Sequence, residues 1–550
     1  MIGVREEDGR RQSLAAPGRV GSVSPACVAL YLAVALGLLI AILHRDGGVF
    51  TYTLDDPYIH LALAENLAHG HYGINPGEAS SPSSSMVWPL LLVPFAGRAW
   101  DMYVPLGLNL LFCAMAAWGI GRIVDGWEWR AHGAADGGAK GTAGPGWPAR
   151  FGIAAALMLV ANLAGLTFVG MEHGLQVLLA IACAAGMVAA FAGRPIPAWC
   201  LWAAALGPMV RYENFALVAA IAVALVGQTR MRAAVRLVAA SLVGPALFSV
   251  FLLSRGLPPL PTSVLVKANA YSLAGDGALA VLGTMYGIAV REGAWWGQLA
   301  VAVLLACLAV GERQRVRRFV LGGALLAAAL QLAAGRVNWF HRYEVYALIF
   351  TALVATTVLI ETVRLRRDVL AGTLAVGLLL LGAPYGWALW DTPAAAANVY
   401  QQQYQMHRFL ADYYRGTVAV NDLGWVSYRR PAGVYVLDLW GLASPEASRQ
   451  AHKDADWLDT ITRAHGAGLA MIYPDWFEEG APDDWDPLAT MCIAGPRVSV
   501  ARPCMVFYDT GVSGTADDKA TLTAEIAAFA RTLPAGVKMR LGRDSTDKDE

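Results

Sequence analysis

The sequence predicts a multi-pass α-helical membrane protein with a small α/β domain at its C-terminal end. The 550-residue chain is 56% hydrophobic and only 15% charged, whereas soluble domains are about 25% charged. Apolar runs with short polar links recur from residue 25 to residue 390. After residue 390, shorter alternating runs typical of strands replace them.

The apolar runs predict about eleven membrane spans, although several are shorter than the roughly 20 residues that a bilayer-crossing helix needs. We place them near residues 25–44, 102–121, 151–169, 174–192, 196–210, 213–229, 237–254, 294–310, 319–334, 344–361 and 368–387. The segment 86–97 is shorter and contains two prolines, so we expect it to be re-entrant or to lie on the membrane surface, with a true span as the alternative. The first span has no small-residue cleavage site after it, which predicts an uncleaved anchor.

Charge bias orients these spans, because basic residues favour cytoplasmic links. With residues 1–24 in the cytoplasm, the strongly basic short links all fall on the cytoplasmic side. The opposite face receives the polar clusters at residues 55–56, 170–173, 211–213, 258–271 and 341–344. We therefore expect a bacterial inner-membrane protein whose polar clusters meet at the periplasmic or extracytoplasmic face.

The composition predicts four consecutive regions: a cytoplasmic segment 1–24, a transmembrane domain 25–390 with a first outer loop 45–100, an outer α/β domain 391–535 and a disordered tail 536–550. In the outer domain we expect strands at 417–420, 434–437 and 469–473 and a helix near 456–465. The last residues are rich in Asp, Lys, Arg and Ser, which is typical of disorder.

The cysteines divide into two groups. Five lie singly in apolar spans, where small buried hydrophobic side chains are expected. Cys492 and Cys504 are the two in the outer domain, and outside the cytoplasm they predict a disulfide. No Cys and His spacing typical of a metal site occurs in the sequence, although a divalent cation held by carboxylates stays open.

Adjacent carboxylates in the first outer loop are the strongest candidates for chemistry, because charge beside a bilayer costs free energy unless it is solvated, paired or used. Asp56 precedes Pro57, so it is either the N-cap of a helix ending near Gly70 or a catalytic group. Asp55 has no comparable local role. A carboxylate held there could take a proton from a sugar hydroxyl.

Further polar residues at span ends have a functional and a structural interpretation each. Glu172 is either a ligand of the acceptor or a solvated turn residue, and Arg211 either binds phosphate or pairs with Glu213. Lys267, His341 and Arg342 are either phosphate ligands or partners of acids such as Glu344.

The serine-rich run 79–85 is either a mobile loop that closes over substrate or an ordinary flexible connection. No nucleotide-binding fingerprint is present in the sequence, and the zero net charge gives no indication of a nucleic-acid partner. An enzyme at the outer face would therefore need an activated donor carried in the membrane, such as a lipid phosphate sugar.

Several segments resemble the GT-C superfamily of glycosyltransferases, and within it the terminal arabinofuranosyltransferase-like branch. These segments are TLDDPYIHLALAENLAHG at 53–70, YGINPGE at 72–78, GME at 170–172, NDLG at 421–424 and VLDLWGL at 436–442. The resemblance implies sugar transfer from a polyprenyl-phosphate donor with a first-loop aspartate as base. Tyr212 stands where the branch has proline, and the loop near 80–85 lacks its Gly-Tyr-Thr-Asn pattern.

Together these features predict an inverting glycosyltransferase that lies in the lipid bilayer and modifies an envelope glycan, lipid or protein. Asp55 is expected to be the base, while Asp56 and Glu172 orient the acceptor or a divalent cation. The other expected site residues are Arg211, Lys267, His341 and Arg342 for the donor phosphate, and Tyr58, His60, Ser83 and Ser84 in the acceptor or substrate loop. A transporter or flippase of lipid-linked sugars and an inert glycan-binding scaffold remain alternatives.

Overall fold

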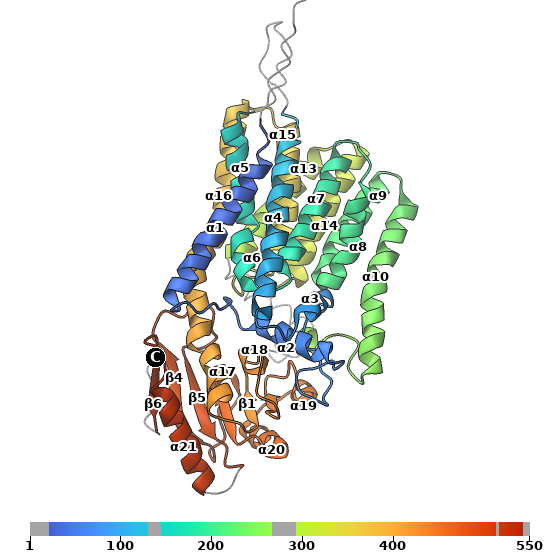
Figure 1. The fold of residues 1–550 in the computed structure, drawn as a ribbon. Helices are drawn as coiled ribbons and strands as arrows, with labels where there is room; N and C mark the ends of the chain where they lie inside the picture. The colour runs from blue at the N-terminus through green and yellow to red at the C-terminus, as the bar shows by residue number, and fades with distance from the viewer. Residues whose placement is uncertain (1–20, 130–144, 267–292, 513–515, 543–550) are drawn as a thin grey trace, which may run out of the picture.

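The computed structural model describes residues 21–129, 145–266, 293–512 and 516–542 as a helical bundle with a sheet-containing domain at one end (Figure 1). Two short helices of the first loop, α2 (Asp56–Ala68) and α3 (Val87–Leu92), lie between the bundle and this C-terminal domain. Residues 1–20 of the predicted cytoplasmic segment, residues 543–550 of the predicted tail, and Lys267 lie outside the described residues.

Within the described residues, nine helical segments are long and apolar enough to cross a membrane, which indicates a membrane protein. They contain α1 (Ser24–Arg45), α4 (Val104–Asp125), α5 with α6 (Trp147–Val160, Leu163–Val169), α7 (His173–Phe191), α10 (Met231–Ser254), α13 (Gly293–Gly311), α14 (Arg315–Ala334), α15 (Val345–Thr362) and α16 (Arg367–Gln401). The other two predicted spans correspond to shorter apolar helices, α8 (Ala198–Val210) and α9 (Phe215–Gly227).

The first loop packs more tightly than its sequence indicates. Residues 87–95 form α3 and the 3-10 turn η1 (Val93–Phe95), which agrees with the prediction that 86–97 does not form a full span. A second 3-10 turn, η2 (Asp101–Tyr103), leads into α4. The prediction of a mobile serine loop is wrong, because Ser80, Ser81 and Ser83–Ser85 are buried and make hydrogen bonds within the fold.

The predicted domain boundary at residue 390 falls inside a helix. The helix α16 continues past it to Gln401, and α17 (Gln403–Asp412) follows almost directly. The proline at 393 lies inside α16 and does not end it. The last turns of α16 therefore connect the bundle to the C-terminal domain as a stiff helical segment.

The C-terminal domain contains one six-stranded mixed sheet with the order β2-β1-β3-β5-β4-β6. The strands are β1 (Val418–Val420), β2 (Val436–Asp438), β3 (Leu469–Ile472), β4 (Asp486–Ile493), β5 (Cys504–Asp509) and β6 (Val537–Leu541). The helices are α18 (Gly424–Ser427), α19 (Pro445–Arg449), α20 (Ala455–His465) and α21 (Ala516–Ala530), with a 3-10 turn η4 (Pro474–Trp476). The parallel pairs are β2–β1 and β1–β3, and the remaining pairs are antiparallel.

The three predicted strands and the predicted helix are confirmed as β1, β2, β3 and α20. The prediction of a disordered tail from residue 536 is wrong over its first residues, because β6 pairs with β4 at the edge of the sheet. Lys538 and Arg540 are exposed on this edge strand. Polar residues at alternate positions suit an edge strand. Judged by composition alone, the same residues are typical of a disordered segment.

The two faces of the sheet pack against different layers. Val418, Val420 and Met471 belong to a hydrophobic core that continues into the bundle, whereas Ala419 and Ala470 face a smaller core. Successive strand residues point to opposite faces, which accounts for this division. The C-terminal domain and the bundle therefore share one continuous core.

Cys492 and Cys504 form the predicted disulfide. They lie opposite each other in the antiparallel pair β4–β5, so the cross-link joins neighbouring strands.

Replacing Cys492 and Cys504 by serine should lower the free energy of unfolding of the C-terminal domain by about 2–4 kcal/mol, because the reduced unfolded chain has more freedom. Thermal unfolding in detergent would measure this loss. The matched control is Cys307→Ser, which changes an exposed free cysteine. Equal unfolding temperatures for the double variant and the control would contradict the expectation.

Candidate functional site

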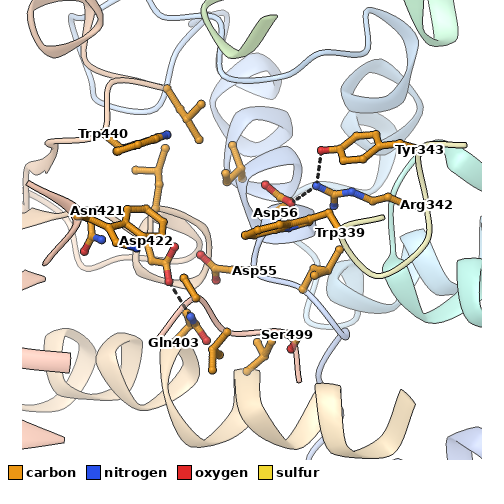
Figure 2. Close-up of a pocket in the computed structure, with 18 of the residues that line it drawn as sticks. Asp55, Asp56, Trp339, Arg342, Tyr343, Gln403, Asn421, Asp422, Trp440 and Ser499 are labelled. Atoms are coloured by element: carbon orange, nitrogen blue, oxygen red, sulfur yellow. Dashed lines mark hydrogen bonds and ion pairs between the residues drawn. The ribbon is translucent and has the colours of Figure 1, made fainter. Parts of the chain in front are cut away.

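A cavity of about 340 Å³ opens between the bundle and the C-terminal domain (Figure 2). The first loop contributes Asp55 and Asp56 to its lining, and the link before α15 contributes Trp339 and Arg342. The C-terminal domain contributes Gln403, Asn421, Asp422, Trp440 and Trp476. Pockets of this size that combine apolar walls with a few convergent polar groups are the usual binding sites for small ligands.

The sheet topology explains why the C-terminal domain presents these side chains together. Asp422 follows β1, Trp440 follows β2 and Trp476 follows β3, and these three strands are parallel. Carboxyl ends of parallel strands meet at one edge of a sheet, and the strand with connections leaving to both sides marks a crevice there. The strand β1 has β2 on one side and β3 on the other, so the cavity lies at this position.

Asp55 joins the two parts of the molecule. Its Oδ2 accepts a hydrogen bond from the Gly424 backbone N–H at 2.6 Å, and its Oδ1 accepts one from the Trp425 N–H at 2.8 Å. These amides lie at the start of α18. The next contact in this interface is the Tyr58 ring, which stacks on Trp425 at 4.0 Å between centroids. The sequence-based expectation that Asp55 has no structural role is therefore wrong.

Two carboxyl groups in the cavity interact electrostatically. Burial and the nearby Asp422 carboxylate raise the pKa of Asp55 well above its usual value, although the two amide hydrogen bonds oppose this. Burial also raises the pKa of Asp422, against hydrogen bonds donated by Gln403 Nε2 at 2.7 Å and the Tyr473 hydroxyl at 2.8 Å. Burial is therefore the main cause of both raised pKa values, and the Asp422 charge adds to it at Asp55.

Asp56 forms an ion pair with Arg342, with 2.7 Å between its Oδ2 and the guanidinium Nη2. Arg342 is 1% exposed, and the Tyr343 hydroxyl accepts a hydrogen bond from the same nitrogen at 2.8 Å. The interpretation of Asp56 as the N-cap is wrong: α2 begins at Asp56, and Asp55 occupies the N-cap position. A buried guanidinium needs an anion, and this need outweighs the local cap.

Aromatic rings and two amide side chains complete the cavity. Trp440 and Trp476 lie 4.9 Å apart between ring centroids, and Trp339 lines the side of the cavity that the bundle forms. Gln403 Oε1 and Asn421 Nδ2 are buried and have no hydrogen-bond partner among the described residues. Such atoms cost free energy unless a ligand or water satisfies them, so they fit a ligand with hydroxyl groups.

Glu172 and Arg211 form a separate ion-paired cluster that does not line the cavity. The Arg211 Nη1 donates to Glu172 Oε1 at 2.6 Å, and its other nitrogens bond the Glu213 carboxylate. His60 and Ser84 also contact this cluster, with His60 Nε2 3.8 Å from Glu172 and Arg211 Nη1 3.3 Å from Ser84 Oγ. The alternative of Glu172 as a solvated turn residue is wrong, and the predicted Arg211–Glu213 pair is confirmed.

The remaining predicted residues that the structure describes do not line the cavity. His341 lies 3.4 Å from Glu344, the acid that the sequence offered as its partner. Tyr58 is buried at the α2–α18 contact and accepts a hydrogen bond from the Tyr52 N–H. Ser83 bonds the backbone of Ser85. The predicted phosphate ligands therefore separate: Arg342 reaches the cavity, whereas Arg211 and His341 do not line it.

Sequence reasoning missed the part of the site that the C-terminal domain provides. The segments containing Asp422 and Trp440 carried the family resemblance but received no role, and Gln403 and Trp476 gave no signal. Asp422 and Trp440 follow directly after β1 and β2, and this position at a strand end is the signal that could have found them. Asp438 supports this edge, because its carboxylate accepts the N–H groups of Trp440, Gly441 and Ala443.

No group of three or more His, Cys, Asp or Glu side chains within the described ranges could hold a metal ion. Comparison with known proteins adds one finding: residues 397–508 match a family model described as a domain of unknown function (DUF8728). No curated protein and no solved structure matches the chain. The matched segment contains β1, β2, β3 and the cavity residues that follow them.

Replacing Gly424 by alanine should destabilise the contact between the C-terminal domain and the first loop. A Cβ atom there would lie 2.0 Å from the Asp55 backbone oxygen, so the backbone must move. We expect a loss of about 1–3 kcal/mol in the free energy of unfolding. The control Gly495→Ala adds a Cβ in ordinary contact with one flexible side chain, and thermal unfolding of both variants is the measurement. A Gly424→Ala protein as stable as the control would show that this contact tolerates a side chain.

Proposed function

We propose that the chain transfers a sugar from a polyprenyl-phosphate donor to a hydroxyl group of a cell-envelope acceptor. The reaction is placed at the periplasmic face of a bacterial inner membrane. The observation that carries the proposal is the cavity at one end of the apolar bundle, which combines Asp55 and Asp422, the Asp56–Arg342 pair and three tryptophans. A membrane-bound donor can reach such a site from the bilayer, and an envelope acceptor can reach it from outside.

Asp55 is the proposed general base. Each of its carboxylate oxygens accepts one backbone N–H, so each retains a second lone pair for an acceptor hydroxyl. The hydroxyl proton moves to Asp55 as the acceptor oxygen bonds the anomeric carbon. The bond from that carbon to the phosphate oxygen breaks in the same displacement, and polyprenyl phosphate leaves with its electron pair. This direct displacement inverts the anomeric configuration.

Asp422 adds to the effect of burial in raising the pKa of this base. A catalytic base works best when its pKa lies near the operating pH, and the neighbouring carboxylate raises the pKa of Asp55 in that direction. The Gln403 and Tyr473 donors hold Asp422 in place. We therefore assign Asp422 a tuning role next to the base.

Arg342 is the proposed ligand of the donor phosphate. It is buried beside the cavity, and its Nε has no hydrogen-bond partner among the described residues. A planar guanidinium binds phosphate oxygens through two parallel hydrogen bonds. Its partner Asp56 neutralises the charge before the donor binds. Arg336 also lines the cavity and adds a second positive charge.

Glu172 and Arg211 support the site indirectly in this proposal. Their charges are satisfied inside the protein, and Arg211 lies 5.3 Å from the Tyr343 ring centroid. Tyr343 in turn contacts Arg342. The cluster thus fixes the wall behind the phosphate ligand. Lys267 stays a proposed phosphate ligand outside the described residues.

Incubation of the purified protein with a panel of polyprenyl-phosphate pentoses and hexoses, plus envelope glycan fragments, tests the function. We expect release of polyprenyl phosphate with at least one donor. Asp55→Asn should reduce that release by about 10²–10⁴-fold, the usual contribution of a general base. The control Asp125→Asn changes an aspartate that pairs with Arg150 near the start of α5, and size-exclusion chromatography verifies that both variants remain folded. Wild-type rates in Asp55→Asn would show that Asp55 is not the base. If no donor releases polyprenyl phosphate, the proposed function is wrong.

The rate should also depend on pH in a defined direction. Asp55 must be deprotonated to act, so transfer falls as the pH drops through its raised pKa. Asp422→Asn removes the neighbouring negative charge and should lower the pKa of Asp55. The acid limb of kcat/KM against pH then moves to lower pH. A shift to higher pH, or none, would contradict the coupling.

A further inference from the structure

The link before α15 contains an unusual backbone segment. Four consecutive residues other than glycine, Asn338, Trp339, Phe340 and His341, have φ between +49° and +65°. Their geometry is a left-handed turn, in which the Arg342 N–H donates to the Asn338 carbonyl oxygen at 3.4 Å. A side chain makes this conformation unfavourable, so it persists only where surrounding contacts impose it.

The Glu344 carboxylate, which is fully buried, contacts this turn at both ends, and Asn162 Nδ2 donates a hydrogen bond to the His341 carbonyl oxygen at 3.2 Å. Glu344 Oε2 accepts the Asn338 N–H at 2.9 Å, and its Oε1 lies 3.4 Å from His341 Nδ1. The Tyr385 hydroxyl donates to the same Oε1 at 3.3 Å. Glu344 thus holds both ends of the strained segment and attaches it to α16.

The strained turn also carries part of the cavity wall. Trp339, which is 50% exposed, lines the cavity of about 340 Å³ and a second one of about 380 Å³ beside it. Arg342 follows the turn directly and pairs with Asp56. A relaxed turn would therefore move the aromatic wall and the guanidinium together.

We propose that Glu344 is a positioning residue, which keeps the 338–341 turn strained so that Trp339 and Arg342 stand ready for the donor. The inference rests on the proposed function for its kinetic consequence. Its structural consequence can be measured without any transfer. Glu344 does not line the cavity. It therefore acts on donor binding through Trp339 and Arg342, and the chemical step belongs to Asp55.

The test compares Glu344→Leu and Glu344→Gln with the wild type and with a matched control. Leucine removes both acceptor oxygens, whereas glutamine keeps one. The control is Glu361→Gln, which changes the glutamate near the other end of α15 that pairs with Arg317 at 3.0 Å. The measurements are hydrogen–deuterium exchange of peptides covering 337–343, and kcat and KM for the donor.

We expect exchange at 338–342 and the donor KM to rise by about tenfold in Glu344→Leu, the usual effect of losing a hydrogen bond to a charged group. The value of kcat should change less than twofold, because ground-state and transition-state binding are lost equally. Glutamine should recover part of both effects, and Glu361→Gln should change neither.

Unchanged exchange in Glu344→Leu would overturn the inference, as would an equal change in the control or a fall in kcat at constant KM. If Glu344→Leu does not fold, Glu344→Gln alone decides, and wild-type exchange and KM in that variant overturn the inference. If the wild type transfers no sugar, the proposed function fails. Exchange by itself then decides whether Glu344 holds the turn.

Discussion

The contact between the Asp55 carboxylate and the first amides of α18 is the constraint on which the site depends. It brings the carboxyl edge of β2, β1 and β3 against the end of the helical bundle. A partly buried carboxylate is costly unless it receives hydrogen bonds, and two backbone N–H groups supply them here. The close approach also requires glycine at 424, because a side chain would meet the Asp55 backbone. The same group that joins the two parts is therefore held inside the cavity that their union creates.

Asp55 and Glu344 obey the same rule at two places in the fold. Each occupies the N-cap position of a helix, α2 and α15 respectively, and neither forms a side-chain hydrogen bond to its own helix. Each carboxylate instead holds another segment: Asp55 holds α18, and Glu344 holds the left-handed turn before it. An N-cap residue normally satisfies its own helix. Here each carboxylate instead accepts backbone N–H groups of another segment, which would cost more free energy if they had no partner.

Charge at this end of the bundle is divided between a satisfied and an unsatisfied region. Arg211 lies between Glu172 and Glu213, so its charge is balanced inside the protein. Asp55 and Asp422 have no cation within bonding distance among the described residues. Burial raises the pKa of both, and the Asp422 charge raises the pKa of Asp55 further. The paired region stabilises the fold, whereas the unpaired carboxyl groups keep the capacity to exchange a proton.

The amino-acid sequence by itself determined the apolar helices, the change in composition after residue 390, three strands, α20 and the disulfide, because periodicity and composition are local properties. It also singled out Asp55, Asp56 and Arg342. Only the tertiary structure decided that Asp56 pairs with Arg342, that Asp55 caps α18, and that Arg211 is neutralised internally. It also added Asp422, Gln403 and Trp476 to the cavity. These pairings join residues far apart in the chain, and which charges meet depends on how the bundle and the sheet dock, a property that no local pattern contains.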